Sequence, residues 1–339
     1  MLFDRSSSSP TTVRLRKRIL ISVGGLSLLL LLAEVGLRTI FGLGNTLMYR
    51  ADLVAGYTLL PNQRIRRLFA LTVVNSRGMR GQEFRSDKPI GALRLMFLGD
   101  SITYGTTQVD QEDIFVEKVR KNLSFEVHRP VEEINASANG WAISNESGFL
   151  RSHGTYDSDY VLLILNSGDL QQSFSTLSDV QGPFTSRPAT AIGELLERML
   201  TFWKQDARQD PGIESPGDPI TEQANLRDLT GMLQFARARG SRFLLVFVPF
   251  RRNIAQGARS SAPKALKDWA DSNDVDLFDL TDAVSAYDTK AITLGDRVHF
   301  NAQGNRLLAD SLERHLVEVC LSKSPNAKGG TVRQLQPGN

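Results

Sequence analysis

Cysteine and histidine are scarce in this sequence. Cys320 is the single cysteine among 339 residues, so the chain can form no disulfide within itself. The four histidines and this cysteine form no cluster with the spacing of a metal site. We therefore expect the protein to need no metal and no other cofactor.

A basic surface interleaved with aromatic residues is also missing. The formal net charge is only +3, and much of the basic excess lies in two short clusters, Arg14–Arg18 and Arg64–Arg67. Neither cluster alternates with aromatic side chains as nucleic-acid-binding surfaces do, so we expect no nucleic acid among the partners.

The sequence has one long apolar run, Ile19–Leu37, which directly follows the first basic cluster. As a helix it can just cross a hydrocarbon layer about 30 Å thick, although a basic segment followed by leucines also describes a signal peptide. Because no small-x-small cleavage site is evident near Ala33, the pattern favours a transmembrane anchor over a cleaved signal. The basic flank predicts that residues 1–18 form a cytoplasmic tail and that the chain after the run lies outside. Glu34, near the far end, is expected at the membrane interface.

The rest of the chain divides into three parts. Residues 38–90 carry turn signals and weak periodicity, which predicts a connector of short strands packed on the main domain. Residues 91–321 form that domain, and the polar residues 322–339 form a tail that we expect not to order. Within the domain, Gln205–Pro219 is rich in proline, glycine and charge and is interpreted as an exposed insertion.

From Arg94 onward, short apolar runs alternate with helical patterns, as in βαβ units. Three of the runs are apolar at both alternating sets of positions, which is typical of parallel strands covered on both faces. The sequence therefore predicts an α/β fold, a three-layer α/β/α sandwich around a five-stranded parallel sheet. The strands are predicted at Arg94–Asp100, Val131–Ser137, Tyr160–Gly168, Arg242–Pro249 and Val275–Leu280. The helices are predicted at Asp113–Leu123, Ala191–Lys204, Thr221–Arg239, Pro263–Asp271 and from about Ala302.

Polar and small residues follow several predicted strands at their carboxyl ends, where parallel sheets collect functional groups. Gly99-Asp100-Ser101 follows the first strand, Gly140 follows the second, and "NSGDL", residues 166–170, closes the third. Farther along the chain, Asp296 and His299 precede the last helix. Taken alone, Ser101 has two interpretations, a nucleophile or simply the cap of a helix.

These residues, in this order, resemble the SGNH or GDSL hydrolase superfamily over roughly Arg94–Val319. The resemblance implies a flavodoxin-like SGNH fold with Ser101 as nucleophile, His299 as base and Asp296 as the carboxylate that orients the base. It also implies that the backbone N–H groups of Ser101 and Gly140 bind the oxyanion. The upstream "VNSRGMRGQEF" is similar to the lead-in of membrane-anchored bacterial members.

The chemistry requires these residue types. A serine hydroxyl is a poor nucleophile at neutral pH unless a base takes its proton, and an imidazole of pKa about 6.5 suits that task. Asp296, close before His299 in the chain, can accept the other ring N–H and fix the tautomer. We expect Asp100 to hold the Ser101 loop by hydrogen bonding, with Asp169 as a second supporting residue. The other histidines are predicted to be solvated or structural: His128, His153 and His315.

The third block departs from the family pattern. The family has an asparagine there whose side chain donates to the oxyanion, and Gly168 occupies that position in this chain. Losing one such donor costs on the order of 100-fold to 1000-fold in rate. Asn166, two residues earlier on the same strand face, could supply the donor or could merely cap the strand. Asn139 and Asn145, beside the turn after the second strand, are the other candidates.

The sequence therefore predicts an extracytoplasmic serine esterase that acts on O-acyl esters, mainly acetyl esters, of carbohydrate by hydrolysis or acyl transfer. The carbohydrate preference follows from the resemblance, because SGNH domains held outside the bacterial inner membrane often act on polysaccharides, as in alginate-type O-acetylation. Two alternatives stay open, a lipid esterase or lysophospholipase and a catalytically weak carbohydrate-binding or assembly protein. The expected partners are an O-acylated carbohydrate or small ester and the membrane. The expected location is the inner membrane, with one pass and a periplasmic catalytic domain.

Overall fold

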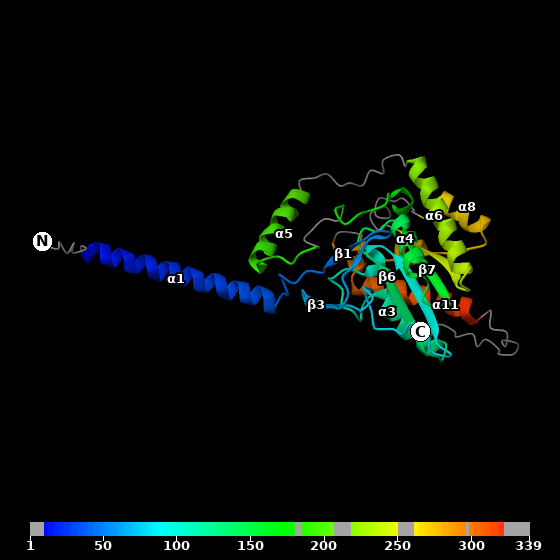
Figure 1. Ribbon diagram of the computed structural model, residues 1–339, viewed down its shortest axis with the longest axis horizontal. Helices are drawn as coiled ribbons and strands as arrows, with labels where there is room; N and C mark the ends of the chain where they lie inside the picture. Colours follow the sequence, from blue (N-terminus) through cyan, green and yellow to red (C-terminus); the bar gives the residue numbers. More distant parts are fainter. Residues whose placement is uncertain (1–9, 180–184, 207–217, 250–260, 296–297, 322–339) are drawn as a thin grey trace.

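The structure is a computed structural model that describes residues 10–179, 185–206, 218–249, 261–295 and 298–321. Three predicted features fall wholly or mostly outside the described residues: the tail 322–339, Asp296 and the insertion Gln205–Pro219. Figure 1 shows a long helix, α1 (Pro10–Thr39), projecting from an α/β domain.

A five-stranded parallel sheet forms the centre of the domain, which confirms the predicted fold class. Its strand order is β6-β5-β7-β8-β9. The strands are β5 (Leu93–Gly99), β6 (Val131–Ser137), β7 (Tyr160–Asn166), β8 (Arg242–Val248) and β9 (Asp276–Asp279). The chain adds β6 on one side of β5 and then crosses to add β7 on the other, so the order reverses between β5 and β7. Such a reversal opens a crevice outside the carboxyl ends of the strands.

Strand β7 ends at Asn166, two residues before its predicted end at Gly168. The backbone N–H of Asn166 donates to the Asp169 side chain (2.7 Å), and Gly168 adopts helical dihedrals (φ −96°, ψ −17°). These two features turn the chain out of the sheet and into a short 3₁₀ helix, η1 (Asp169–Gln171). The other predicted strands and helices agree with the structure to within a few residues.

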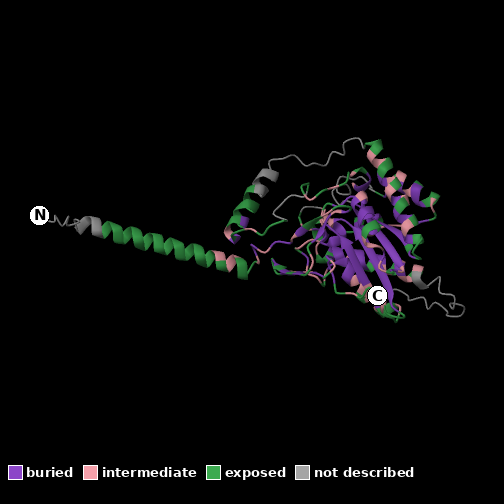
Figure 2. Cartoon of the chain, in the orientation of Figure 1, coloured by how far each residue is buried: buried purple, intermediate pink, exposed green. Residues whose placement is uncertain are grey.

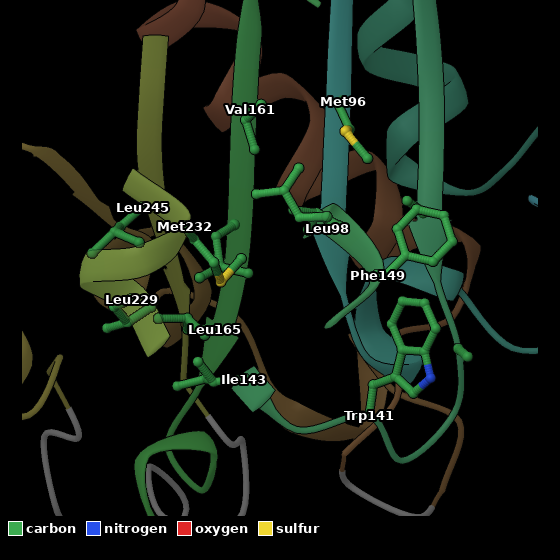
Figure 3. Packing of buried hydrophobic residues seen from close by; sticks show 14 of the residues in the cluster. Met96, Leu98, Trp141, Ile143, Phe149, Val161, Leu165, Leu229, Met232 and Leu245 are labelled. Carbon is green, nitrogen blue, oxygen red and sulfur yellow. The ribbon is translucent and has the colours of Figure 1, made fainter. Parts of the chain in front are cut away.

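Helices cover both faces of the sheet and complete three layers. They are α2 (Ser101–Tyr104), α3 (Phe115–Glu126), α4 (Ile143–His153), α6 (Pro219–Arg237), α8 (Lys264–Ser272), α9 (Thr281–Ser285), α10 (Thr289–Ile292) and α11 (Ala302–Leu321). Helix α5 (Ala191–Asp206) lies apart from the sheet, beside the end of α1 (Figure 1). Residues of α4, α6 and α8 share one hydrophobic core, and residues of α3, α9 and α11 share the other. Along β5, Met96 and Leu98 enter the first core (Figure 3), while Leu95 and Phe97 enter the second. This alternation explains why both faces of the strand are buried and why Leu95–Leu98 is an unbroken apolar run.

Two antiparallel hairpins occupy the segment between α1 and β5. β1 (Tyr49–Asp52) pairs with β2 (Gly56–Leu59), and β3 (Gln63–Arg67) pairs with β4 (Ala70–Val74). Both hairpins contribute buried side chains to the same core as α4 and α6. The segment therefore packs on one face of the sheet.

Helix α1 is exposed along most of its length (Figure 2). The most apolar 18 residues within Arg14–Thr39 have a mean hydropathy of 2.2, and among the described residues α1 is the one helix long and apolar enough to cross a membrane. Signal sequences share these properties, so the helix is either a signal sequence or a membrane anchor.

A buried pair of carboxyl groups makes the stability of the domain depend on pH. Glu133 of β6 and Glu117 of α3 both contact the guanidinium of Arg120, at 3.0 Å and 2.5 Å. Burial, followed by the negative charge of Glu117, raises the pKa of Glu133 to about 8. Glu133 therefore holds its proton more tightly in the folded protein than in the unfolded chain.

We expect Glu133→Gln to remove part of this pH dependence. The pKa of unfolded Glu133 is near 4.5, so the wild-type free energy of unfolding falls as the pH rises from about 5 through about 8. Glutamine cannot ionise, and the variant should gain stability relative to wild type across this range. Urea unfolding at a series of pH values measures the difference, with Glu112→Gln at an exposed side chain as the control. A difference that stays constant with pH would contradict the expectation.

Candidate active site

Ser101 lies at the start of the short helix α2, directly after β5. The Asp100 side chain accepts a hydrogen bond from the Ile102 N–H (2.8 Å) and so caps this helix. The helix ends after one turn at Gly105, whose φ of 83° lies in the left-handed region that favours glycine. Because Asp100 supplies the cap, the hydroxyl of the half-buried Ser101 is not needed for that role.

His299 is presented by the loop that precedes α11. Thr293 and Phe300 form an antiparallel bridge, and the Leu294 N–H donates to the His299 carbonyl (2.9 Å), so the loop closes on itself. Phe300 is buried in the second core and fixes the base of the loop, while His299 stays half-buried. Asp296 belongs to this loop but lies outside the described residues, so its contact with His299 stays a prediction.

The fold brings Ser101 and His299 together from positions 198 residues apart in the sequence. The Oγ of Ser101 and the Nε2 of His299 lie 2.8 Å apart, a hydrogen-bond distance. An imidazole whose Nε2 accepts this bond carries its proton on Nδ1 and can take the hydroxyl proton as the serine attacks a carbonyl. The pair therefore has the geometry of a serine nucleophile and its general base.

Asn166 ties the end of β7 to the end of β5. Its side-chain nitrogen donates to Asp100 (3.1 Å) and to Asp169 (2.6 Å), and its side-chain oxygen accepts the Gly168 N–H (2.7 Å). Both hydrogens of this buried amide are thus engaged inside the protein. In this structure Asn166 is a positioning residue for Asp100, and Asp100 in turn caps the helix that carries Ser101.

Three buried carboxyl groups gather beneath the site. Burial raises the pKa of Asp100, although the Ile102 N–H and His299 oppose the rise. Burial, followed by the charge of Asp100, raises the pKa of Asp169 well above its ordinary value. Burial, followed by the charges of Asp169 and Asp100, raises the pKa of Glu146 of α4 well above its ordinary value, and one oxygen of this carboxyl has no hydrogen-bond partner among the described residues. Glu146 was not identified from the sequence, where nothing distinguishes it from an exposed glutamate.

The turn after β6 leaves Gly140 exposed, with a left-handed φ of 75°. The Tyr57 hydroxyl of the first hairpin donates to the Asn139 carbonyl (2.6 Å), and the Gln172 side chain donates to the Gly140 carbonyl (3.0 Å). These bonds hold the carbonyls on both sides of the turn. The Gly140 N–H donates to no other atom in the described part of the chain.

Asn139 and Asn145 differ in the availability of their amides. Asn145 is completely buried, and its side-chain nitrogen donates to the carbonyls of Ala55 (2.9 Å) and Ser175 (2.7 Å). Asn139 is half-buried, and its side chain makes no hydrogen bond within the ranges that the structure describes. Of the three asparagines that the sequence offers as donors, Asn139 is the one whose amide is uncommitted there.

Arg80, a residue of the segment before β5, positions the loop that follows α2. It is completely buried, and its guanidinium donates to the carbonyls of Tyr104 (2.8 Å), Thr106 (2.5 Å) and Val109 (2.7 Å). The sequence shows only a charged residue in a turn-rich stretch. Its three partners follow Ser101 in the chain, more than 20 residues after Arg80, so the residues next to Arg80 do not indicate this role.

We expect Arg80→Met to lower the free energy of unfolding by roughly 3 kcal/mol, since it leaves several buried carbonyls without donors. Urea unfolding of the two proteins measures the loss. Arg64→Met on the neighbouring hairpin is the matched control, because Arg64 is exposed and its replacement should change stability by less than about 0.5 kcal/mol. Equal free energies of unfolding for Arg80→Met and wild type would show that the guanidinium does not stabilise the fold.

The three other histidines have partners elsewhere in the structure. The ring of His128 contacts Phe125, and His153 stacks on Phe149. His315 stacks on Phe278 and shares a hydrogen bond with Asp276 (2.7 Å). In the described residues none of them is bonded to Ser101.

The GDSL-like lipase/acylhydrolase family matches residues 97–307, a segment that includes Ser101, Gly140, Asn166 and His299. No curated protein sequence matches the chain.

Among solved structures, the crystal structure of TesA is 16% identical, with a TM-score of 0.41, and the match covers 66% of this chain and 97% of that one. A two-domain esterase active on acetylated mannans is 17% identical, with a TM-score of 0.43 and coverage of 69% and 51%. An acetyl-xylooligosaccharide esterase from Geobacillus is 16% identical, with a TM-score of 0.42 and coverage of 67% and 95%.

Proposed function

The chain belongs to the GDSL-like lipase/acylhydrolase family and is an esterase, and we propose that it removes or transfers acetyl groups on carbohydrate outside the bacterial inner membrane. The observation that carries the esterase chemistry is the 2.8 Å contact between Ser101 Oγ and His299 Nε2. It lies where the strand order reverses, the usual place for a ligand crevice in a parallel sheet.

In the proposed mechanism, Ser101 Oγ attacks the ester carbonyl while His299 takes its proton. His299 then returns this proton to the leaving alkoxide, and an acyl-enzyme remains on Ser101. Water or another hydroxyl attacks that ester and gives its proton to His299, which returns the proton to Ser101 Oγ as the acyl–oxygen bond breaks and the acid or new ester leaves. Asp296 accepts a hydrogen bond from the Nδ1–H group of His299 throughout and stabilises the imidazolium.

The proposed oxyanion site combines two backbone groups with one side chain. The N–H groups of Ser101 and Gly140 donate to the oxyanion, as the family resemblance implies. Asn139 supplies the third donor in place of the side chain that Gly168 lacks. The free amide of Asn139 beside Gly140, set against the engaged amides of Asn166 and Asn145, supports this assignment.

A polar rim supports a carbohydrate substrate. The half-buried Gln172 donates to the Gly140 carbonyl (3.0 Å), and the exposed Gln171 beside it donates to Glu222 (2.9 Å). Side chains of this kind bind sugar hydroxyls, whereas a groove for long acyl chains is lined by apolar residues. The proposed location has α1 as an uncleaved anchor, with the basic cluster Arg14–Arg18 in the cytoplasm.

A series of p-nitrophenyl esters, run beside acetylated xylan, tests the substrate proposal. We expect kcat/KM to be greatest for the acetyl ester and to fall as the acyl chain lengthens, with acetate released from the xylan. Adding an oligosaccharide acceptor separates the two reactions, because acetyl transfer yields an acetylated oligosaccharide in place of free acetate.

Two results would overturn the proposal. A preference for acyl chains longer than about six carbons would identify a lipid esterase or lysophospholipase. Folded protein that hydrolyses none of the esters would identify a carbohydrate-binding or assembly protein that retains the fold.

A further inference from the structure

The amphipathic helix α5 is fastened to the end of α1. Glu34 of α1 accepts hydrogen bonds from the N–H groups of Ala191 (2.8 Å) and Ile192 (3.0 Å), the first residues of α5. A carboxylate is favourable at a helix N-terminus, where the N–H groups lack partners within the helix. Arg38 of α1 also pairs with Glu34 (2.6 Å) and donates to the Ala189 carbonyl (2.9 Å). The carboxyl group expected at a membrane interface thus caps a helix 157 residues away.

Glu194 makes a second attachment between α5 and the rest of the molecule. It is 2% exposed and accepts hydrogen bonds from the Arg67 guanidinium of β3, from the Gly44 N–H (2.6 Å) and from Arg198 (2.8 Å). Although burial opposes ionisation, these donors lower the pKa of Glu194 to about 2, so it is charged at neutral pH. These bonds hold α5 beside the C-terminal end of α1, with the axes of the two helices crossing (Figure 1).

The outward face of α5 is apolar. Four large side chains form one stripe along the helix and are between 37% and 62% exposed: Leu195, Leu196, Met199 and Leu200. In the part of the chain that the structure describes, no other element covers them.

The tip of the β3–β4 hairpin presents a second apolar group next to the end of α1. Leu68 and Phe69 are 44% and 69% exposed, and the Phe69 ring contacts Phe41, just beyond α1, with centroids 6.0 Å apart. Arg64 and Arg66 project into solvent from β3 of the same hairpin. The second basic cluster therefore flanks an exposed apolar tip.

We propose that the apolar face of α5 and the tip of the β3–β4 hairpin lie in the headgroup layer of the bilayer that α1 crosses. This inference rests on the proposed anchoring by α1. The apolar face of α5 and the tip of the β3–β4 hairpin both lie beside the C-terminal end of α1. If α1 crosses the bilayer, they therefore lie level with the membrane surface. An amphipathic helix at that height buries its apolar face among the lipids, and Arg64 and Arg66 face anionic headgroups. The α/β domain is then held in one orientation on the membrane, whereas α1 alone would leave its orientation unrestrained.

Site-specific fluorescence on the full-length protein tests this proposal. In a Cys320→Ser background, single cysteines replace Leu200 of α5, Phe69 of the hairpin tip, Leu28 of α1 or the fully exposed Ile90 before β5. Each is labelled with nitrobenzoxadiazole and reconstituted into vesicles of phosphatidylcholine and phosphatidylglycerol that contain brominated lipid. We expect the label to lose fluorescence at positions 200, 69 and 28 and to keep it at position 90. Replacing Arg64 and Arg66 by glutamate should reduce the loss at position 69.

The other outcomes contradict the proposal in distinguishable ways. Quenching at position 28 alone would keep the anchor and overturn the proposed placement of α5 and the hairpin. Absence of quenching at all four positions would show that α1 is not in the membrane, so the premise would fail. Disulfides between two chains of the unlabelled Leu200→Cys variant, without quenching of the labelled protein, would show that a second copy covers α5. Hydrolysis of p-nitrophenyl acetate by the same vesicles reports on the esterase function separately.

Discussion

Ser101→Ala is expected to lower kcat for p-nitrophenyl acetate by about 10⁴-fold or more, because no other group can form the acyl-enzyme. His299→Ala should have an effect of similar size, since the hydroxyl then keeps its proton. The two residues act as a unit through their 2.8 Å contact, so the double variant should be hardly worse than either single one. A fluorophosphonate probe should label the wild type at Ser101 and label neither variant.

Ser124→Ala is the matched control for these variants. Ser124 lies on α3 and donates only to the Arg129 carbonyl at the surface (3.0 Å), so activity and labelling should stay at wild-type levels. Folded wild-type protein that takes up no label would contradict the esterase assignment itself. Labelling that persists in Ser101→Ala would place the nucleophile elsewhere.

Asn139→Ala is expected to lower kcat by on the order of 100-fold with little change in KM, because an oxyanion donor acts on charge that develops only in the transition state. Adding Gly168→Asn to this variant should recover part of the loss. Gly168 has φ −96° and ψ −17°, a conformation that any residue adopts, so an asparagine there needs no change of backbone. It would also restore the family's own pattern at the third block.

Steady-state kinetics on p-nitrophenyl acetate measures both effects, and Asn122→Ala serves as a control. Asn122 lies on α3 and bonds Glu313 of α11 (2.8 Å), on the other face of the sheet from Asn139, so kcat should not change. Wild-type kcat in Asn139→Ala would remove Asn139 from the oxyanion site. A further fall in kcat on adding Gly168→Asn would show that the third block works differently in this chain.

The strands and the proposed pair of Ser101 and His299 could be predicted because their signals are local. A strand covered on both faces carries apolar residues on both alternating sets of positions, as Leu95–Leu98 of β5 does, and such a run is visible without any knowledge of its neighbours. Ser101 directly follows that run and His299 precedes a long helix, so each residue is located by the element next to it. A serine after the strand and a histidine before the helix are the residue types that a nucleophile and its general base require, and this completes the prediction.

The groups that support the site were not predictable in the same way. Asp100 and Asn166 are 66 positions apart, and the sequence contains several asparagines with an equal claim to the oxyanion. Which of them is committed to other partners depends on the packing of β5 against β7 and of the first hairpin against α4. Arg80 and Glu146 are similar cases, since burial turns two ordinary charged residues into parts of the site.

By itself the sequence determined the parallel sheet, the apolar N-terminal helix and the identity of Ser101 and His299, because periodicity and motif are properties of neighbouring residues. Only the tertiary structure decided that Asn166 positions Asp100, that the amide of Asn139 is free within the described chain and that Glu34 caps α5. The physical reason is that a hydrogen-bond donor or acceptor can be assigned a role only when its partner is known. In this protein those partners come from elements that the fold, and not the order of the chain, places side by side.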